Sequence, residues 1–429
     1  MALSNFSKNI SLMAMGVGGS QAIGLFASPI ISRLFTPDDF GVAAVFLSVV
    51  TIAAIPSTLR LEHAVALPGT DREAFGVIYA SLQAMCVSFF LIILTLYIGQ
   101  SAFPSLIERS RLGGFIVFLP PAILLTGLVQ LLVAWAAREK KFIAIGKANF
   151  WQSIVIVSTR IACGVSVGSS ALVLVITQMI GGVNKVAIVG RSIVTMQDLK
   201  RLYLYRQSFR KVVSEYHQFP LYSVPTGLMR SFNENMPILL LAALFEPVSV
   251  GLFAMASRLI KLPIQVVGEP IRLAYLQKAS ELANTSVSLN KSLGKLTLAL
   301  VFMSLLMIVP LALYGEELFE MVLGHSWAKA GIYGSIVSPW FASIFIQLPS
   351  ACVYIVYKKQ NQLLVFQSLA TVSMLICGGV VFYSGMTIMQ ALALISCVGT
   401  LLNLTIIWNA FLIGKKESRV KADNLGGSI

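Results

Sequence analysis

Apolar stretches of about 20 residues recur along almost the whole chain, and they limit what it can fold into. A helix of that length crosses the hydrocarbon core of a bilayer, which is about 30 Å thick. Only 12% of the 429 residues are charged, against about 25% in soluble proteins. The pattern predicts an all-α polytopic membrane protein with 12 transmembrane helices, one or two of which could be re-entrant where Gly and Pro interrupt them. The predicted spans are 11–32, 41–59, 74–98, 113–137, 146–167, 171–190, 219–243, 249–271, 296–313, 331–356, 363–384 and 387–412.

The net charge of +14 raises the question of a nucleic-acid partner, and the distribution of the charge argues against one. If the N-terminus is cytoplasmic, 22 of the 32 basic residues fall in cytoplasmic segments and four fall in outer segments. This asymmetry is typical of inner-membrane proteins and predicts that both termini are cytoplasmic. No loop exceeds about 30 residues, which is too little surface for a nucleic-acid-binding domain. We therefore expect a membrane protein of the cytoplasmic (inner) membrane with no nucleic-acid partner.

Cysteine and histidine are placed in a way that predicts neither disulfides nor a metal site. The five cysteines all fall inside predicted spans, where they are small apolar packing residues, and the three histidines are scattered. No cofactor is expected beyond a coupling ion. The N-terminus lacks the charged region and the cleavage pattern of a removable signal peptide, so the first span is expected to stay as an anchor.

The chain reads as two halves of six spans each. The predicted lobes are 1–195 and 218–429, joined by a basic, Tyr-containing cytoplasmic segment at 196–217. Both halves open alike, with "PIISRLFTPDDFGVAAVFLSVVTIAAIP" in the first and "PILLLAALFEPVSVGLFAMASRLIKLP" in the second. Six spans per half give the halves the same orientation, so they would be parallel repeats. Transporters built this way bind their substrate at the repeat interface near the midplane.

The eighth span carries charged residues in the stretch "SRLIKLPIQVVGEPIR". Each charge costs roughly 2.5–3.5 kcal/mol at the bilayer centre. On a continuous α-helix Arg258, Lys261, Gln265, Glu269 and Arg272 share an arc of about 80°. Snorkelling to the headgroups explains Arg272, but Arg258 and Lys261 are far from either interface. For these two the pattern favours a water-filled, positively charged cavity.

The seventh span contains "MRSFNENMPILLL", in which Arg230 and Glu234 are four residues apart and so share one helix face. Two interpretations remain open. The pair is a structural ion pair, or Glu234 exchanges a proton or a sodium ion. Glu269 is the second candidate for ion coupling.

In the first half, Arg33 ends the first span and Arg60 ends the second. Charges at span ends are common, and the Pro-Asp-Asp sequence that holds Asp38 and Asp39 is typical of a turn. Snorkelling explains Arg160, in the fifth span, poorly. The full set of predicted substrate-binding cations is Arg33, Arg60, Arg230, Arg258 and Lys261.

Several classes of function are disfavoured. No G-x-x-x-x-G-K-[ST] sequence is present, so P-loop nucleotide hydrolysis is excluded. The longest outer segments, about 99–112 and 314–330, are too short for the active site of a polymerase or ligase. We therefore expect a transporter rather than an enzyme, driven by an ion gradient (Na⁺ or H⁺) or by the gradient of its substrate.

Four stretches resemble bacterial polysaccharide (O-antigen-type) flippases. "SRLFTPDDFGVAAVFLS" is similar to their first hairpin, and "RLEHAVALP" to the segment after their second helix. "FPLYSVPTGL" and "NMPILLLAALFEPVSVGLFAMASRLIKLPIQVVGEPI" resemble their seventh and eighth helices. The resemblance covers about 1–75 and 217–280; elsewhere it rests on span number and loop pattern.

The resemblance implies the fold of the multidrug/oligosaccharidyl-lipid/polysaccharide exporter (MOP) superfamily, with two six-helix lobes around a central cavity. It implies an undecaprenyl-pyrophosphate-linked oligosaccharide as cargo, moved to the outer leaflet by alternating access. Arg33, Arg60 and Arg258 fall on motif positions, whereas Lys261 and Glu234 do not. Besides the cargo and membrane lipids, a polysaccharide polymerase and a chain-length regulator are candidate partners. The alternatives are a cation-coupled multidrug exporter, which predicts a net acidic cavity, and a membrane-embedded polymerase or ligase.

Overall fold

The chain folds into helices that pack as two compact units, Met1–Gly251 and Leu252–Ile429. The computed structural model describes the backbone of 2–102, 113–205, 209–283 and 289–426, and within these ranges it contains no strand. Side chains are described for 15–99, 113–198, 200–205, 209–268, 270–282 and 289–417. The all-α prediction is confirmed.

The first unit holds the helices up to α10. These are α1 (Ala2–Leu34), α2 (Pro37–Ser57), η1 (Leu61–Ala64), α3 (Asp71–Ala102), η2 (Gly113–Phe118), α5 (Leu119–Arg138), α6 (Phe142–Ser166), α7 (Ala171–Ile193), α8 (Met196–Leu204), α9 (Phe209–Glu215), η3 (Phe219–Ser223) and α10 (Val224–Leu244). The first turn of α11 also belongs to this unit.

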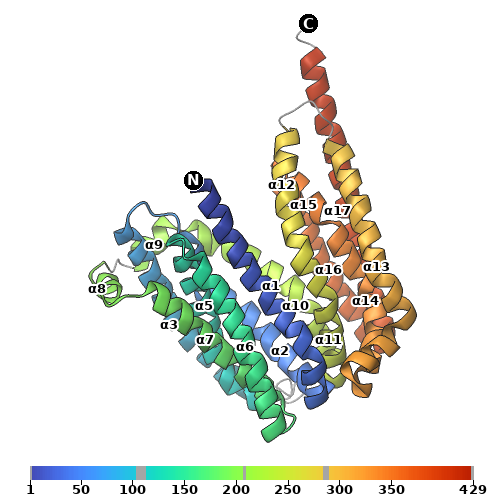
Figure 1. Ribbon diagram of the computed structural model, residues 1–429, viewed down its shortest axis with the longest axis horizontal. Helices are drawn as coiled ribbons and strands as arrows, with labels where there is room; N and C mark the ends of the chain where they lie inside the picture. Colours follow the sequence, from blue (N-terminus) through green and yellow to red (C-terminus); the bar gives the residue numbers. More distant parts are fainter. Residues whose placement is uncertain (1, 103–112, 206–208, 284–288, 427–429) are drawn as a thin grey trace. The chain divides into compact units, whose positions relative to one another are not determined.

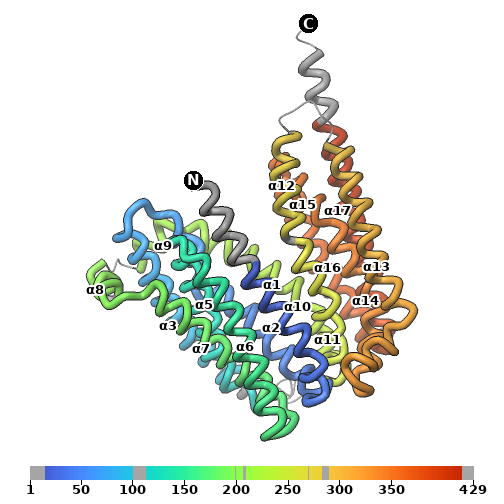
Figure 2. The backbone as a smooth tube through the Cα atoms, viewed as in Figure 1, coloured from blue at the N-terminus to red at the C-terminus, as the bar shows by residue number. Residues whose placement is uncertain are grey.

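The second unit holds the remaining helices. These are α11 (Pro247–Pro263), η4 (Ile264–Gly268), α12 (Glu269–Ala283), α13 (Leu289–Leu323), η5 (His325–Trp327), α14 (Ala328–Ile346), α15 (Leu348–Val356), α16 (Gln360–Ser384) and α17 (Ile388–Gly426). In Figure 2 the path from α11 through η4 to α12 can be followed as one helical run.

Each predicted span coincides with one helical stretch of the structure. Within the described residues, nine of these stretches are long and apolar enough to cross a membrane. The other three predicted spans correspond to α1, α6 and α10. Two of these helices carry charge well inside their length, for example Arg160 in α6 and Glu234 in α10. The protein is therefore a multi-pass membrane protein.

The outer segment predicted as a loop at 314–330 differs from the structure. There α13 continues to Leu323 after a kink at Tyr314, whose φ is −131°. Gly315 and Gly331 let α13 and α14 approach closely, because a Cβ atom on either glycine would overlap the backbone of the other. Small residues at helix crossings permit such contacts in membranes. The loop prediction was wrong here because this packing depends on a partner helix.

In the first unit α1 lies beside α6 (Figure 1), again through small residues. Gly16 of α1 lies against the backbone of Gly146, and Gly19 lies against the ring of Phe150. At the other end of the same pair, Gly164 of α6 leaves room for Phe35. Glycine at these positions lets two apolar helices pack without a hydrophobic driving force between them.

The segment predicted to connect the lobes, 196–217, contains α8 and α9. Both pack against α3, and Val212 of α9 is buried in the same core as Phe75 and Trp135. The Phe75 ring meets that of Trp135 edge to face at a centroid distance of 5.5 Å. The first compact unit thus takes in α8, α9 and α10, and the lobe boundaries at 195 and 218 stay a prediction.

In the second unit α14 packs against α13 and α17 (Figure 1). Two hydrogen bonds involving buried polar side chains join α15 and α14 to α17. The Tyr354 hydroxyl donates to the carbonyl of Ile406 at 3.1 Å, and the Asn403 amide donates to the Ser343 hydroxyl at 2.8 Å. These bonds fix the register of α14 and α15 against α17.

Candidate functional site

The first charged motif, Arg33 to Gly41, joins α1 to α2. Thr36 caps α2 and forms a reciprocal capping box with Asp39, and Ser169 donates to the same Asp39 carboxylate. Asp39 therefore serves the turn, as its sequence predicts. Arg33 is exposed at the end of α1 and donates to the Pro29 carbonyl at 3.2 Å, so most of its guanidinium is available.

The second charged motif forms a compact cluster after α2. Leu59 and Arg60 adopt left-handed conformations with φ of 53° and 58°, which turn the chain sharply at the helix end. The carboxylate of Glu62 is 3% exposed and accepts from the Thr58 hydroxyl at 2.5 Å. The Arg60 Nη1 lies 3.5 Å from Glu62 and 3.2 Å from the His63 Nε2.

This cluster touches α10 through a glycine. A Cβ atom at Gly227 would come within 2.5 Å of the Arg60 Nη2, so the guanidinium lies directly on the α10 backbone. Two stretches that carry the family resemblance, "RLEHAVALP" and "FPLYSVPTGL", therefore meet in the first unit. The Nε of Arg60 is buried and meets no acceptor among the described residues, which leaves the cation with unused donor capacity.

Arg138 holds the loop that follows the cluster, a role that its sequence position does not suggest. Its Nη1 donates to the carbonyls of Val65 at 3.1 Å and Pro68 at 2.8 Å. Its Nη2 lies 3.4 Å from the Thr70 carbonyl and 3.4 Å from the Asp71 carboxylate. In the sequence Arg138 is only one of the basic residues that lie on the predicted cytoplasmic side. Its partners are about 70 residues away along the chain, so no local pattern could reveal them.

The predicted pair on α10 forms as the spacing indicates. The Arg230 Nε donates to a Glu234 carboxylate oxygen at 3.0 Å. Both side chains are exposed, at 74% and 60% of their surface. A pair this open contributes little stability, about as much as a surface ion pair, and the carboxylate of Glu234 is not enclosed by the described side chains.

In the second unit α11 carries Arg258 and Lys261. Arg258 is exposed, and the Lys261 ammonium lies 5.2 Å from the centroid of the buried Phe341 ring. Aromatic rings attract cations over their faces, so Phe341 is a cation–π partner of Lys261. Trp340 stacks on Phe341 at a centroid distance of 5.1 Å and completes this aromatic support.

The backbone breaks the predicted arc of charged and polar residues between Lys261 and Arg272. The predicted arc requires a continuous α-helix, but η4 (Ile264–Gly268) is a π-helix that follows Pro263. Proline has no N–H to donate to the preceding turn, and a π-turn inserts about one extra residue. Positions after η4 are therefore rotated by about 100° from the predicted arc, and Arg272 no longer follows Arg258. The side chain of Glu269 lies outside the described residues.

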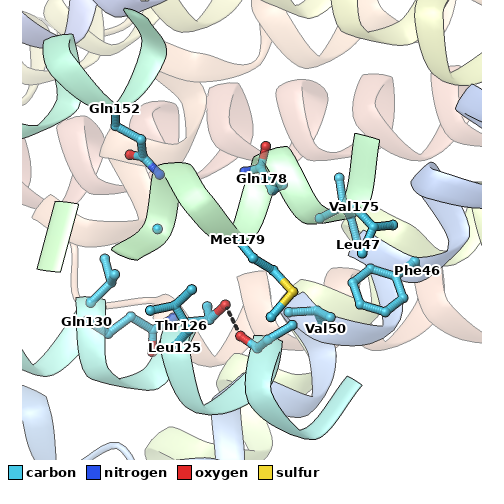
Figure 3. A pocket seen from close by; sticks show the side chains of 13 residues that line it. Phe46, Leu47, Val50, Leu125, Thr126, Gln130, Gln152, Val175, Gln178 and Met179 are labelled. Atoms are coloured by element: carbon cyan, nitrogen blue, oxygen red, sulfur yellow. Dashed lines mark hydrogen bonds between the residues drawn. The ribbon is translucent and has the colours of Figure 1, made fainter. Parts of the chain in front are cut away.

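Arg160, which snorkelling did not explain, is buried inside the first unit. It is 7% exposed and donates from Nε to the Thr177 hydroxyl and from Nη2 to Gln178, each at 3.2 Å. Gln178 in turn lines a cavity of about 270 Å³ between α2, α5, α6 and α7. Figure 3 shows three amide side chains around this cavity, from Gln130, Gln152 and Gln178.

The structure thus brings some predicted site residues together and leaves others apart. In the first unit Arg60 meets α10, and Arg230 meets Glu234, whereas Arg33 lies at the end of α1 and donates to Pro29 of its own helix. In the second unit Arg258 and Lys261 occupy neighbouring turns of α11. No group of three or more His, Cys, Asp or Glu residues in the described chain is close enough to hold a metal ion.

The comparisons with solved structures concern the fold. The chain is similar to "Lipid II flippase MurJ, inward closed conformation", with a TM-score of 0.69, 14% identity, and coverage of 95% of this chain and 90% of that one. It is also similar to an inward-facing multidrug resistance MATE family transporter of the MOP superfamily, with a TM-score of 0.64, 12% identity, and coverage of 96% and 98%. A third structure, of MATE in the bent conformation, gives a TM-score of 0.54, 12% identity, and coverage of 98% and 97%.

These likenesses confirm the predicted MOP-type membrane fold, since each covers nearly the full length of both chains. Identities of this size carry no information on cargo. No protein of curated function matches the sequence. The sequence model of a family described as polysaccharide biosynthesis proteins matches residues 30–331, which is most of the chain. The chain therefore belongs to the polysaccharide biosynthesis protein family and has the fold of the MOP superfamily.

Proposed function

We propose that the protein flips an undecaprenyl-pyrophosphate-linked oligosaccharide from the cytoplasmic to the outer leaflet by alternating access, for the synthesis of a surface polysaccharide such as O-antigen. The observation that carries the proposal is Arg258, an arginine that is exposed as a residue, lies well inside an apolar helix and makes no ion pair with a described residue. A cation without an ion pair inside a membrane-spanning helix is costly. A pyrophosphate headgroup offsets the cost, and the planar guanidinium can bind it through two hydrogen bonds.

The other predicted cations fit the same chemistry. Lys261 adds a second charge one turn away from Arg258, held over Phe341. In the first unit the guanidinium of Arg60 keeps a donor without a partner among the described residues, and Arg33 and Arg230 are exposed. We assign these five residues to the binding of phosphates or acidic sugars. The family description, which concerns polysaccharide biosynthesis, supports a sugar-bearing cargo.

We further propose that export is coupled to a proton or sodium gradient through Glu234. Its carboxylate is exposed, and among the described residues its ion-pair partner is Arg230, so protonation or sodium binding can compete with the ion pair. Glu269 is the second candidate for ion coupling.

The inner membrane is the expected location, with both termini in the cytoplasm. A polysaccharide polymerase and a chain-length regulator are the expected protein partners downstream.

A cation-coupled multidrug exporter is the second candidate function, because the fold is shared with a MATE family transporter. The residues of α10 and α11 argue against it. Arg230, Arg258 and Lys261 outnumber the single carboxylate of Glu234 among the described side chains of these two helices, and an excess of cations repels cationic drugs.

The test uses purified protein in proteoliposomes that contain a polyprenyl-pyrophosphate-linked oligosaccharide. A membrane-impermeant glycan-cleaving enzyme measures the rate at which the sugar reaches the outside. We expect Arg258→Ala to lower the rate at least tenfold and Arg258→Lys to keep part of it. The control Lys329→Ala removes an exposed positive charge from the start of α14 and should leave the rate unchanged.

The same vesicles separate the alternatives. Full flipping by Arg258→Ala would remove this residue from the binding site, and failure of the wild-type protein to flip the cargo would reject the function. Efflux of a cationic dye by the wild-type protein would instead support the multidrug exporter. Lengthening of the glycan would support a polymerase.

A further inference from the structure

A second set of cations surrounds a cavity that the proposed function does not use. The cavity lies between α12 and α13 in the second unit and has a volume of about 640 Å³. We call it the Lys278 cavity. Its lining includes Ile271, Tyr275 and Lys278 of α12 and Lys291, Lys295 and Ala299 of α13.

The lining comes from one face of each helix. Along α12 the residues Ile271, Tyr275, Lys278 and Leu282 are three or four positions apart, as are Lys291, Lys295 and Ala299 along α13 in steps of four. Such spacing keeps side chains on the same face of an α-helix. The three lysines are exposed, and none makes an ion pair with any residue whose side chain the structure describes. Their charges are therefore available to a ligand.

A buried hydroxyl also lines the Lys278 cavity. Tyr275 is 4% exposed, and its hydroxyl is buried without a hydrogen bond of normal geometry among the described residues. Ser292, on the facing helix, is close enough to interact weakly with this hydroxyl, but the two do not form a hydrogen bond of normal distance and angle. A buried polar group without a well-formed hydrogen bond destabilises the fold. A ligand that accepts a hydrogen bond from Tyr275 would recover this loss.

The cavity changes from basic to apolar along its length. Ile271 lies seven residues before Lys278 on α12, which corresponds to about 10 Å along the helix axis. Ala274 and Ala299 line the apolar part. Beside it on α13, Leu298 and Phe302 are exposed at 70% and 64%, as expected of side chains that face acyl chains. A ligand with a charged head and an apolar tail matches this gradient.

A second lysine-rich cavity provides a comparison. In the first unit Lys140, Lys141 and Lys147 line a cavity of about 370 Å³ with Ile143, Ala144, Ile188 and Ser192. None of these lining residues has a buried side-chain polar atom that lacks a partner. Topology alone requires basic residues at one side of a membrane, but it does not require a buried, unsatisfied hydroxyl beside them.

We propose that the Lys278 cavity binds the phosphate of an anionic membrane phospholipid. Lys278, Lys291 and Lys295 surround the phosphate, the Tyr275 hydroxyl donates to one of its oxygens, and an acyl chain follows Ile271 and Ala299. Basic cavities between transmembrane helices hold anionic headgroups in this way. The proposal concerns the second unit alone and does not depend on the cargo of the transporter.

The test is native mass spectrometry of the full-length protein in detergent, titrated separately with phosphatidylglycerol, phosphatidylcholine and a polyprenyl pyrophosphate. We expect the wild-type protein to bind phosphatidylglycerol at least tenfold more tightly than phosphatidylcholine. The triple variant K278Q/K291Q/K295Q should bind it at least tenfold more weakly. The matched control K140Q/K141Q/K147Q, which loses the same charge from the other cavity, should stay within twofold of wild type.

Tyr275→Phe is the second variant, because it keeps the ring and removes only the hydroxyl. We expect about fivefold weaker binding of phosphatidylglycerol, as for the loss of one hydrogen bond. Equal weakening by both triple variants would reduce the effect to general charge and overturn the proposal. Unchanged binding by the cavity variant, or equal affinity for the two phospholipids, would also overturn it. Binding of the polyprenyl pyrophosphate without phosphatidylglycerol would assign the cavity to the cargo instead.

Discussion

Gly41 and Gly251 make reciprocal contacts within the first unit. Gly41 lies against the carbonyl of Pro247, and Gly251 lies against the carbonyl of Pro37. Each glycine stands four residues after the proline that begins its own helix, so the first turn of α2 and the first turn of α11 contact one another in the same way. A contact in which i meets j and j meets i is what two copies of one motif produce about a two-fold axis. The repeated sequences that begin the two halves therefore meet at equivalent positions.

The first prediction concerns this contact. Gly41→Ala or Gly251→Ala should destabilise the protein by about 1–3 kcal/mol, because the new methyl group would overlap a backbone carbonyl that cannot rotate away. The measurement is the thermal midpoint of the purified protein in detergent. Gly190→Ala is the matched control, since that helical glycine has no atom within 4 Å of its missing Cβ, and alanine favours helix. Equal midpoints for all three variants would show that the two turns are not in close contact.

The second prediction links Arg60 to Gly227. Because a methyl group at Gly227 would press on the Arg60 guanidinium, Gly227→Ala should lower flipping to nearly the level of Arg60→Ala. The double variant should be no worse than Arg60→Ala alone, since both changes act on one side chain. Flipping in proteoliposomes is the measurement, and Gly69→Ala, at an open position in the same region, is the control. Additive losses in the double variant would place Gly227 in a separate role.

The helices and the Arg230–Glu234 pair were predictable because both follow from local periodicity. Apolar runs of about 20 residues determine the spans, and a spacing of four determines which side chains on α10 meet. The extension of α13 past Tyr314 was not predictable, since it rests on the close approach of Gly315 to Gly331 in another helix. The same limit applies to the cation–π contact of Lys261 with Phe341, because the two residues are 80 positions apart in the sequence.

Charge counting also has a limit that Arg138 illustrates. As one of many basic residues on the predicted cytoplasmic side, it looked like a topological signal. In the structure its guanidinium binds three backbone carbonyls of the loop after η1. Sequence cannot separate a charge that sets topology from one that organises a loop, because both lie at helix ends. Buried Arg160 was recognised only as an exception to snorkelling, and its partners Thr177 and Gln178 lie on the next helix.

The third prediction tests this role of Arg138. Arg138→Lys keeps the charge but cannot reproduce the set of hydrogen bonds that the guanidinium makes at 2.8–3.4 Å. We expect amide hydrogen exchange in the segment 66–70 to become at least about tenfold faster, which corresponds to the loss of about 1.4 kcal/mol in local stability. Arg191→Lys, an exposed arginine at the end of α7, should leave exchange in this segment unchanged. Unaltered exchange in Arg138→Lys would show that the loop holds its shape without these bonds.

The fourth prediction separates the two roles left open for Glu234. Glu234→Gln keeps the size of the side chain and removes the charge that pairs with Arg230. If the carboxylate carries the coupling ion, flipping by this variant should lose its dependence on the pH or sodium gradient. Arg230→Gln is the control, because it breaks the same pair while it leaves the carboxylate in place. A gradient dependence that survives in Glu234→Gln would make the residue a structural partner only.

The last prediction concerns the π-helix η4, which sets the rotation of α12 relative to Arg258 and Lys261. Deletion of Val266 should convert the wide turn into an α-helical one, because a π-turn holds about one residue more than an α-turn. All residues of α12 would then rotate by about 100° against α11, and the face of α12 that packs on α15 would turn away. We expect flipping to fall at least tenfold, whereas Val266→Ala, which keeps the residue count, should stay within twofold of wild type. Leu273→Cys places a thiol at a position that is 57% exposed. In the deletion variant the rate at which this thiol reacts with a water-soluble maleimide should change. If deletion left both the flipping rate and this reactivity unchanged, the π-helix would not determine how α12 is presented.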